Sequence, residues 1–476
     1  MEWVGSFEVP GSGNAVAGRL IVGDERSELT VIAPLGPSRA GELLDSDSPQ
    51  NLPLVRGVTT EGTPVTAVDL TPVGESWHSR AGSAWTVETW IPGYVVEAHF
   101  DSEDRPTFTG ASLSLTYLSS WLGSPLPKTQ ATENSFALEV ETRTLAKATH
   151  QVGSYDFSGR AGTTSGFDAT SLDFPAVALV EPALPVELGE LVESMITPLE
   201  ALLWVATGRF SDTDLHVRLD GDTSVFAKVW VPWIRPSAHE PQKRRLIGQE
   251  MLFQAEELPG GIEEGLPRWL DVWPVLRDAL GPVIARDRAP FSYTDDRFAS
   301  AIAGLEAYSL LRHGEYQMSR EERALRVAAI AKAVERDKPE YLEWLLEALG
   351  QAHRHTLRSR LNKTLDEAGE LGSTLLGEAR EKFIGAVIKS RNQVAHSLPR
   401  QGGLPGGAAM HWASRGFSWL LRYLAMNELG FAPDASRDRV LASHTFRQEA
   451  DLLQGALMSD APALSPDEEE FPAANP

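Results

Sequence analysis

Cysteine is absent from the 476 residues of this chain. Its absence excludes a disulfide framework, a zinc site with cysteine ligands, an iron–sulfur cluster and a catalytic thiol. Long apolar runs are also missing: no segment reaches 18 consecutive apolar residues, so we expect no membrane-spanning helix. Positive charge is scarce, with 43 Lys and Arg against 66 Asp and Glu and a net charge of −23. That balance argues against a general nucleic-acid binder, because binding of phosphates requires a positive field.

The rest of the composition is that of an ordinary globular protein, with 42% hydrophobic and 23% charged residues. A chain of this length predicts about two to four domains. The first residues, Met1-Glu2-Trp3, carry neither the basic start nor the apolar core of a signal peptide. We therefore expect a cytoplasmic protein.

Residues 1–175 have the pattern of a β-rich domain. Short apolar runs bounded by Gly, Pro, Ser and Asp predict strands at 18–22, 29–32, 63–70, 85–90 and 112–117. Their spacing is typical of an all-β sandwich or a barrel-like sheet.

Residues 176–293 predict a mixed α/β connector. Apolar residues recur at intervals of three and four over 188–207, which indicates an amphipathic helix. Residues 215–220 and 223–231 alternate apolar with polar around Asp220-Gly221, a pair typical of hairpin turns. A helical run rich in Trp and Leu follows at about 266–285.

Residues 294–455 predict an antiparallel helical bundle. We expect helices through Phe298 to Leu305, after a capping box at 319–322, after Pro339, from about Ser373 or Thr374 to Pro399, and over about 408–428. Residues 456–476, with an acidic run at 467–470, predict a disordered acidic tail. The expected fold class is α+β, with a β-rich N-terminal domain, a mixed connector and an all-α bundle.

Arg391, Asn392 and His396 lie together at the end of the helix that Pro399 closes. This combination suits metal-free RNA cleavage. A histidine that titrates near neutrality can take the proton from a ribose 2′-hydroxyl. A permanently charged guanidinium can stabilise the negative charge that gathers on the attacked phosphate. The asparagine can orient the other two groups or contact the RNA backbone.

The spacing alone carries little weight, because an Arg followed five positions later by a His is expected about once by chance in this composition. Arg439 and His444 share the spacing without the asparagine, and we interpret that pair as incidental. On a straight helix Arg391 and His396 lie about 140° apart, whereas Asn392 and His396 share a face. Both groups reach one phosphate if the arginine curls round, if the helix deforms, or if a second subunit completes the site, which predicts a symmetric dimer.

The motif from Arg391 to His396 on a helical bundle resembles the HEPN superfamily, whose ribonucleases carry an Arg–polar–x–x–x–His motif. Residues 298–306 look like the opening helix of HEPN domains associated with ApeA-type proteins of antiphage defence. Segments at 18–20, 55–66, 95–100 and 118–121 are similar to the ApeA N-terminal domain and occur in the expected order. Together the two resemblances cover most of the chain.

The resemblance implies a metal-independent endoribonuclease that acts in abortive infection and cleaves host RNA, possibly a tRNA. It implies that Arg391 stabilises the phosphate, that Asn392 supports it, and that His396 is the general base or acid, with no metal and no cofactor. Glu306 matches a position where such domains often hold an acidic residue, and we expect it to support the site. The resemblance also implies a homodimer or higher homo-oligomer and a phage-derived trigger sensed by the N-terminal domain.

Other functional classes stay open. A non-catalytic HEPN sensor or adaptor would bind a phage protein, a nucleotide or RNA without cutting it. A carbohydrate-binding β module is suggested by Trp77, Trp85 and Trp90, although a buried sheet face explains these tryptophans equally well. For Arg391 and His396 the structural alternative is a surface helix end, where cations interact favourably with the helix dipole.

Two further patterns are interpreted as structural. His353 and His355 would diverge by about 200° on a helix, so we expect a solvated turn rather than a metal site, with RNA docking as an alternative because basic residues follow. The glycine-rich stretch 11–18 lacks the lysine of a phosphate-binding loop and precedes a strand, which predicts a hairpin.

The net charge is unevenly distributed along the chain. Residues 1–294 carry −19, residues 295–455 carry +1, and residues 456–476 carry −5. Within 351–400, nine basic residues stand against five acidic ones. The acidity therefore belongs to the predicted sensor and tail, which leaves room for a narrow RNA site in the bundle and suggests that the acidic half repels RNA until a trigger acts.

Overall fold

The computed structural model describes two compact units of the chain. The first comprises Met1–Leu203, Ser211–Gly248 and Gln254–Pro267, and the second comprises Trp204–Phe210, Gln249–Phe253 and the chain from Arg268 onward. The described residues are 1–23, 27–35, 51–80, 83–100, 105–123, 128–132, 135–139, 144–159, 162–165, 170–173, 175–219, 226–231, 246, 248–289, 292–351, 353–398 and 402–458. Among these residues, none of the helices combines the length and the hydrophobicity that a membrane crossing requires.

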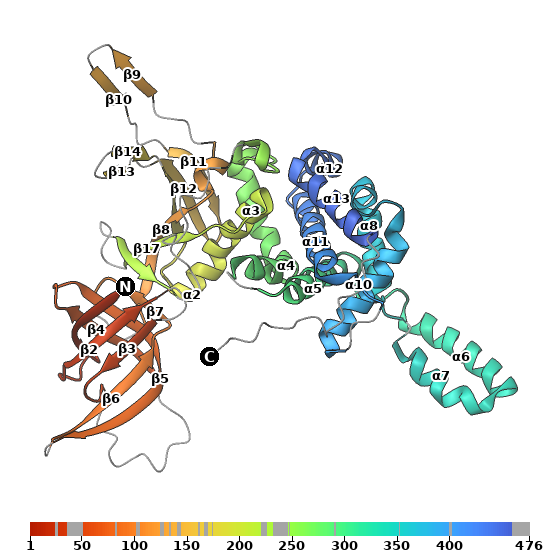
Figure 1. Cartoon of the computed structure of the whole chain (residues 1–476), viewed down its shortest axis with the longest axis horizontal. Helices are drawn as coiled ribbons and strands as arrows, with labels where there is room; N and C mark the ends of the chain where they lie inside the picture. The colour runs from red at the N-terminus through yellow and green to blue at the C-terminus, as the bar shows by residue number, and fades with distance from the viewer. Residues whose placement is uncertain are drawn as a thin grey trace, which may run out of the picture. The chain divides into compact units, whose positions relative to one another are not determined.

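Six of the described strands in the first unit form a closed antiparallel ring (Figure 1). The order around the ring is β5 (Pro64–Arg80), β4 (Leu52–Thr59), β1 (Glu2–Glu8), β2 (Val16–Val22), β3 (Ser27–Val31) and β6 (Ser83–Ile91), and β6 pairs with β5. Alternate side chains point into the ring and form an apolar core around Phe7, Leu20 and Trp90. Gly57 leaves room for the Phe7 ring, because a Cβ at position 57 would lie 2.5 Å from two of its atoms.

The sheet continues from β5 into a second set of strands. Beyond β5 the order is β7 (Tyr94–Val96), β18 (Phe226–Trp230), β17 (Thr213–Leu219), β8 (Thr107–Leu115), β15 (Ala176–Pro182), β12 (Gly153–Gly159) and β11 (Thr144–His150), with β16 (Val186–Glu187) also on β8. Two separate ribbons pair β9 (Lys128–Thr132) with β10 (Ser135–Glu139) and β13 (Gly162–Ser165) with β14 (Thr170–Asp173).

The strands predicted from the sequence are present in this sheet. The predicted segments at 18–22, 29–32, 63–70, 85–90 and 112–117 correspond to β2, β3, β5, β6 and β8. The two predicted hairpin strands are β17 and β18, which pair antiparallel, and the predicted turn at Asp220-Gly221 lies outside the described residues. The β-rich N-terminal region expected from the alternation is therefore confirmed. β15, β17 and β18 lie beyond residue 175 but pair with strands before it, so one sheet spans both sequence segments.

The amphipathic helix predicted over 188–207 has an irregular middle. α1 (Leu118–Trp121) precedes it in the chain; α2 (Leu188–Leu191) then leads through a π-helical segment, Val192–Ile196, into α3 (Thr197–Thr207). Pro198 accounts for the irregularity, since it has no N–H to donate to the carbonyl four residues earlier. Tyr155 of β12 donates a hydrogen bond of 3.0 Å to the carbonyl of Met195, which ties the helix to the sheet.

The second unit is helical, as the sequence predicts (Figure 1). Its helices are α4 (Gly261–Arg288, of which Arg268 onward lies in this unit), α5 (Thr294–His313), α6 (Arg320–Asp337), α7 (Leu342–Ala348), α8 (Leu357–Ala368), α9 (Glu370–Leu376), α10 (Arg380–His396), α11 (Gly406–Glu428), α12 (Pro433–Ala442) and α13 (His444–Met458). The predicted helix start at Ser319 is confirmed, because Ser319 is the N-cap of α6 and its Oγ accepts a hydrogen bond of 3.1 Å from the N–H of Glu322. The Glu322 carboxylate accepts a hydrogen bond from Arg326, so only the serine half of the predicted capping box is present. α11 packs against α5 and α13, and most of its residues are buried.

The helix that carries the motif is shorter than predicted. A start near Ser373 or Thr374 is wrong: α9 ends at Leu376, Gly377 has a φ of 56°, which glycine adopts without penalty, and α10 begins at Arg380. α8, α12 and α13 are further helices that are not predicted from the sequence, and their buried faces are narrow, with four, two and three buried residues. α13 extends the helical region to Met458, and the rest of the predicted acidic tail lies outside the described residues.

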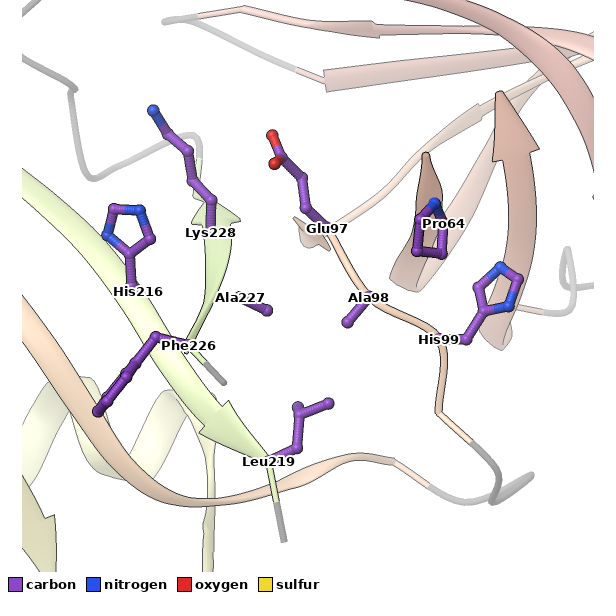
Figure 2. A pocket seen from close by; sticks show the side chains of 9 residues that line it. All are labelled: Pro64, Glu97, Ala98, His99, His216, Leu219, Phe226, Ala227 and Lys228. Atoms are coloured by element: carbon purple, nitrogen blue, oxygen red, sulfur yellow. The ribbon is translucent and has the colours of Figure 1, made fainter. Parts of the chain in front are cut away.

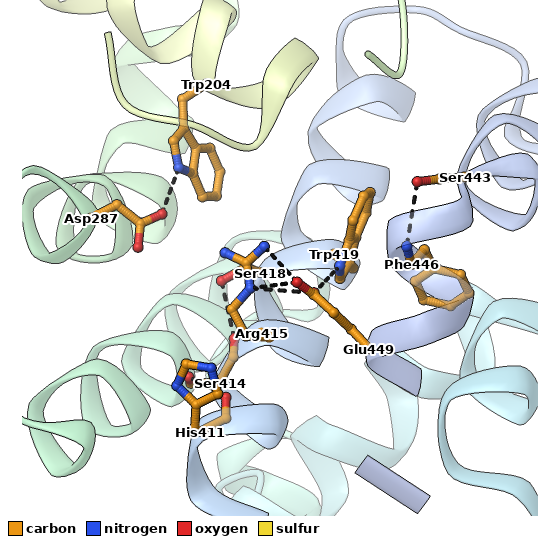
Figure 3. A network of polar contacts seen from close by, with 10 residues as sticks. All are labelled: Trp204, Asp287, His411, Ser414, Arg415, Ser418, Trp419, Ser443, Phe446 and Glu449. Atoms are coloured by element: carbon orange, nitrogen blue, oxygen red, sulfur yellow. Dashed lines mark hydrogen bonds and ion pairs between the residues drawn. The ribbon is translucent and has the colours of Figure 1, made fainter. Parts of the chain in front are cut away.

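A polar network holds α11 in the bundle (Figure 3). Arg415 forms an ion pair with Glu449 of α13, with an N–O distance of 3.0 Å. Glu449 also accepts a hydrogen bond of 2.7 Å from the indole N–H of Trp419. One carboxylate therefore satisfies two side chains of α11 that lie one turn apart.

Arg422, one turn further along α11, is buried and binds the end of α3. Its guanidinium donates hydrogen bonds of 2.9 Å to the carbonyl of Val205 and 3.1 Å to the carbonyl of Ala206. It also stacks on Trp419, 4.3 Å from the ring centroid. Burial lowers the pKa of Arg422, and the helix-terminal carbonyls, where negative charge accumulates, offset the cost of burying the cation.

Candidate functional site

α10 positions the three residues that the sequence singles out. Its buried side chains recur with helical periodicity and pack toward α5 and α8: Phe383, Ile384, Val387 and Ser390. Arg391 follows this face and is partly buried, whereas Asn392 and His396 are exposed. The amphipathic pattern of α10 therefore presents Asn392 and His396 to solvent and holds Arg391 at the boundary.

Arg391 is paired with Glu306 of α5. Its Nη2 lies 3.6 Å from Oε2 of Glu306, and the two side chains are 36% and 29% exposed. A guanidinium carries five N–H donors, so one carboxylate contact orients Arg391 and leaves donors for a phosphate. The structure thus brings together two residues that are far apart in the sequence and that the family resemblance links only by position.

The face that carries Asn392 and His396 ends abruptly. α10 is helical through His396, so Asn392 and His396 share a face and Arg391 is turned about 140° from His396. Ser397 then adopts the left-handed conformation, with φ 50° and ψ 38°. The N–H of Leu398 donates a hydrogen bond of 2.9 Å to the carbonyl of Gln393. The left-handed conformation costs a serine about 1 kcal/mol of conformational free energy. This strained residue immediately follows the exposed His396 in the chain.

The chain after α10 packs back onto the same helix. The N–H of Leu404 donates a hydrogen bond of 2.8 Å to Ser390 Oγ, on the residue before Arg391. Gly403 permits this approach, because a Cβ there would lie 2.4 Å from Ser390 Oγ. Residues 402–404 thereby flank the candidate site, and a larger side chain at 403 would displace them.

The second Arg and His pair of the same spacing has a different environment. Arg439 of α12 donates a hydrogen bond of 3.0 Å to the carbonyl of Leu252, and its guanidinium lies 5.6 Å from the centroid of the Phe431 ring. His444 begins α13, so the two residues are on separate helices. This pair lacks the one-helix arrangement of Arg391, Asn392 and His396.

His353 and His355 are not in a solvated turn, contrary to the sequence prediction. Each is only 9% exposed. His353 stacks on Tyr316, with ring centroids 4.9 Å apart, and the two ring nitrogens of His355 lie 3.1 Å from Ser359 Oγ and from Lys363 Nζ. Burial lowers the pKa of both histidines, and neighbouring cations act in the same direction. The described residues contain no group of three His, Asp or Glu side chains arranged to hold a metal ion.

The first unit contains a separate cavity of about 430 Å³ (Figure 2). Figure 2 shows Lys228 and Glu97 extending in the same direction, with His216 beside Lys228. The cavity combines a cation, a carboxylate, two imidazoles and apolar surface, which suits a small polar ligand or a peptide segment. The sequence does not predict it, because its lining comes from separate strands: Pro64, Glu97, Ala98, His99, His216, Leu219, Phe226, Ala227 and Lys228.

Comparison with known families matches both halves of the chain. A family model described as ApeA N-terminal domain 1 matches residues 2–264, more than half of the sequence. A family model described as Apea-like HEPN matches residues 299–435, a range that includes Glu306, Arg391, Asn392 and His396. No curated protein and no solved structure matches the chain significantly.

Proposed function

Because the chain belongs to the ApeA family of antiphage-defence proteins and carries an Apea-like HEPN domain, we propose that it is a metal-independent endoribonuclease that acts in abortive infection. The observation that carries this proposal is the arrangement on α10. Asn392 and His396 share an exposed face, and Glu306 orients Arg391, which lies about 140° from His396 on the same helix. HEPN domains are commonly ribonucleases, and these residue types suit phosphoryl transfer from RNA.

His396 takes the proton from a ribose 2′-hydroxyl, and the resulting oxygen attacks the adjacent phosphorus. The bond from phosphorus to the 5′-oxygen breaks, and that oxygen takes a proton from an imidazolium as it leaves. The products are a 2′,3′-cyclic phosphate and a 5′-hydroxyl. Arg391 stabilises the charge on the phosphate oxygens, and Asn392 donates a hydrogen bond that positions the backbone.

A second copy of the chain completes the site. His396 and Arg391 diverge by about 140° on one helix, so a phosphate that contacts His396 of one copy reaches Arg391 most directly when a twofold-related copy supplies it. The active species is therefore a homodimer or a higher homo-oligomer. The substrate is host RNA in the cytoplasm, with tRNA as the first RNA to test.

The N-terminal unit acts as the sensor of a phage-derived trigger. Residues 1–294 carry −19, and this charge disfavours RNA near that part of the chain. The cavity that includes Lys228 and Glu97 is a candidate place for the trigger to bind.

The test is RNA cleavage by the full-length chain in EDTA. Wild-type protein should cut RNA, whereas His396→Ala and Arg391→Ala should each lose about a thousandfold in rate, in the range expected for loss of a general base or of charge stabilisation. His444→Ala is the matched control, because His444 has the same spacing from an arginine and is also exposed. Tight RNA binding without cleavage by the wild type would favour the non-catalytic sensor or adaptor instead.

A further inference from the structure

α6 and α7 form a helical hairpin inserted between α5 and α8, and neither helix has a buried residue. Figure 1 shows the two helices side by side and apart from the other helices of the second unit. Every neighbouring helix of the bundle, by contrast, buries an apolar face. A helical hairpin with no buried face gains little stability from tertiary packing, which is the main source of helix stability in proteins.

The base of this hairpin is nevertheless well defined. The N–H of Gln317 donates a hydrogen bond of 2.8 Å to the carbonyl of His353, and the N–H of His355 donates one of 3.1 Å to the carbonyl of Glu315. The two ends of the insertion are therefore paired as a short antiparallel ribbon. Arg323 of α6 donates a hydrogen bond of 3.2 Å to the carbonyl of Leu349, just after α7. Backbone and side-chain hydrogen bonds therefore hold the two ends of the hairpin together where it joins α5 and α8.

α7 has one broad apolar face, which is only partly covered. Leu342 and Leu345 on this face are half-buried, whereas Trp344, about 160° from Leu342 around the helix, is 67% exposed. Tyr341, the residue before α7, is 54% exposed. On α6, Leu325 is 74% exposed. A broad apolar helix face is normally covered, and exposed aromatic residues on such a face mark protein interfaces.

The charges of the hairpin indicate what covers it. Residues 320–338, which include α6, hold six basic and four acidic side chains. Residues 339–351, which include α7, hold three acidic side chains and neither Lys nor Arg. Two such hairpins related by a twofold axis would place the basic helix of each copy against the acidic helix of the other, so the surface is complementary to itself.

We propose that the α6–α7 hairpin is an interface between two copies of this chain, in which Trp344 and Tyr341 of each copy pack against α6 of the other. The four helices then form a bundle that covers the apolar outer side of α7. This proposal rests on the proposed function for its expectation of a dimer and adds which surface holds the copies together.

Two charge-reversed, full-length variants test the proposal by their molar mass in sedimentation velocity. One carries Arg326→Glu, Lys332→Glu and Arg336→Glu in α6; the other carries Glu340→Lys, Glu343→Lys and Glu347→Lys in and beside α7. Each variant alone should have half the mass of the wild-type assembly, because like charges then face each other. An equimolar mixture should regain the wild-type mass, because opposite charges meet again.

A single substitution gives an independent measure. Trp344→Ala should weaken self-association at least tenfold, whereas Tyr293→Ala, an 83% exposed tyrosine outside the hairpin, should leave it unchanged. Wild-type protein that is monomeric, variants that keep the wild-type mass, or a mixture that stays at half mass would each overturn the proposal. RNA cleavage by a protein that assembles through another surface would leave the proposed function standing and remove only this interface.

Discussion

α10 and α11 are successive helices that both carry arginine and histidine, yet they use them differently. On α11, Arg415 pairs with Glu449, and Arg422 is buried on the carbonyls that end α3. On α10, His396 is exposed, and Arg391 contacts a single carboxylate at the surface. Residue type alone therefore does not show which arginines are structural. Burial and the number of internal partners differ between the two helices, and a buried guanidinium bonded to carbonyls is less available to a phosphate than an exposed one.

The same distinction applies to the two pairs with identical spacing. Arg439 is occupied by a backbone carbonyl and an aromatic ring, whereas Arg391 is held from one side by Glu306. The first arrangement anchors α12, and the second presents a cation. This comparison fails if removing Arg391 destabilises the fold as strongly as removing an internally bonded arginine such as Arg422.

The largest contrast is expected in stability. Arg422→Ala should lower the free energy of unfolding by about 3 kcal/mol, because the last carbonyls of α3 lose their donor and a cavity opens in the bundle. Arg391→Ala should lower it by less than about 1 kcal/mol, because its ion pair is partly exposed. Urea unfolding followed by circular dichroism measures both. Equal losses would show that Arg391 is as structural as Arg422.

A smaller effect is expected at Glu306. Glu306→Gln keeps the size of the side chain but removes the charge that orients Arg391, so kcat should fall about tenfold, or about 1.4 kcal/mol. KM should not rise, since loss of a carboxylate near the phosphate also removes repulsion. The split between kcat and KM distinguishes positioning from a general loss of structure. A variant with kcat unchanged would mean that Glu306 does not act through Arg391.

The smallest effect is expected from pH. Burial lowers the pKa of His411 on α11 and of His355 below the ordinary value of 6.5. As the pH falls, the unfolded chain therefore takes up protons at these two histidines before the folded chain does, so stability should fall as pH drops below about 6.5. The urea midpoint should be lower at about pH 5.5 than at about pH 7.5.

The control for that pH effect lies in the histidines themselves. His411→Gln or His355→Gln should reduce the difference between the two urea midpoints. A midpoint that is independent of pH in the wild type would contradict the lowered pKa of these two histidines.

Much of the fold is predictable from local pattern. Alternation and turn residues predict β2, β3, β5, β6 and β8, and the capping box at Ser319 predicts the start of α6. The start of α10 is not predictable in this way, because the apolar spacing continues through Gly377 and the break depends on its positive φ. The closure of six strands into a ring depends on the pairing of β6 with both β3 and β5, which no local pattern encodes.

The candidate site divides in the same way. Arg391, Asn392 and His396 form a local motif, and helix periodicity alone predicts which of them share a face. The contact between Arg391 and Glu306 joins α10 to α5, and only the family resemblance pointed to that glutamate. His353 and His355 are covered by contacts with residues outside their own segment: Tyr316 stacks on His353, and Lys363 contacts His355. A prediction from residue type alone does not include these contacts, and it therefore places both histidines in solvent.

The most direct test of the account is the chemistry of the RNA ends. Wild-type protein incubated with RNA in EDTA should leave 2′,3′-cyclic phosphates and 5′-hydroxyls. His444→Ala should leave the same ends at the same rate, and His396→Ala should leave none above background. Products with 5′-phosphates, or cyclic phosphates formed at an undiminished rate by His396→Ala, would contradict attack by a 2′-hydroxyl that His396 activates.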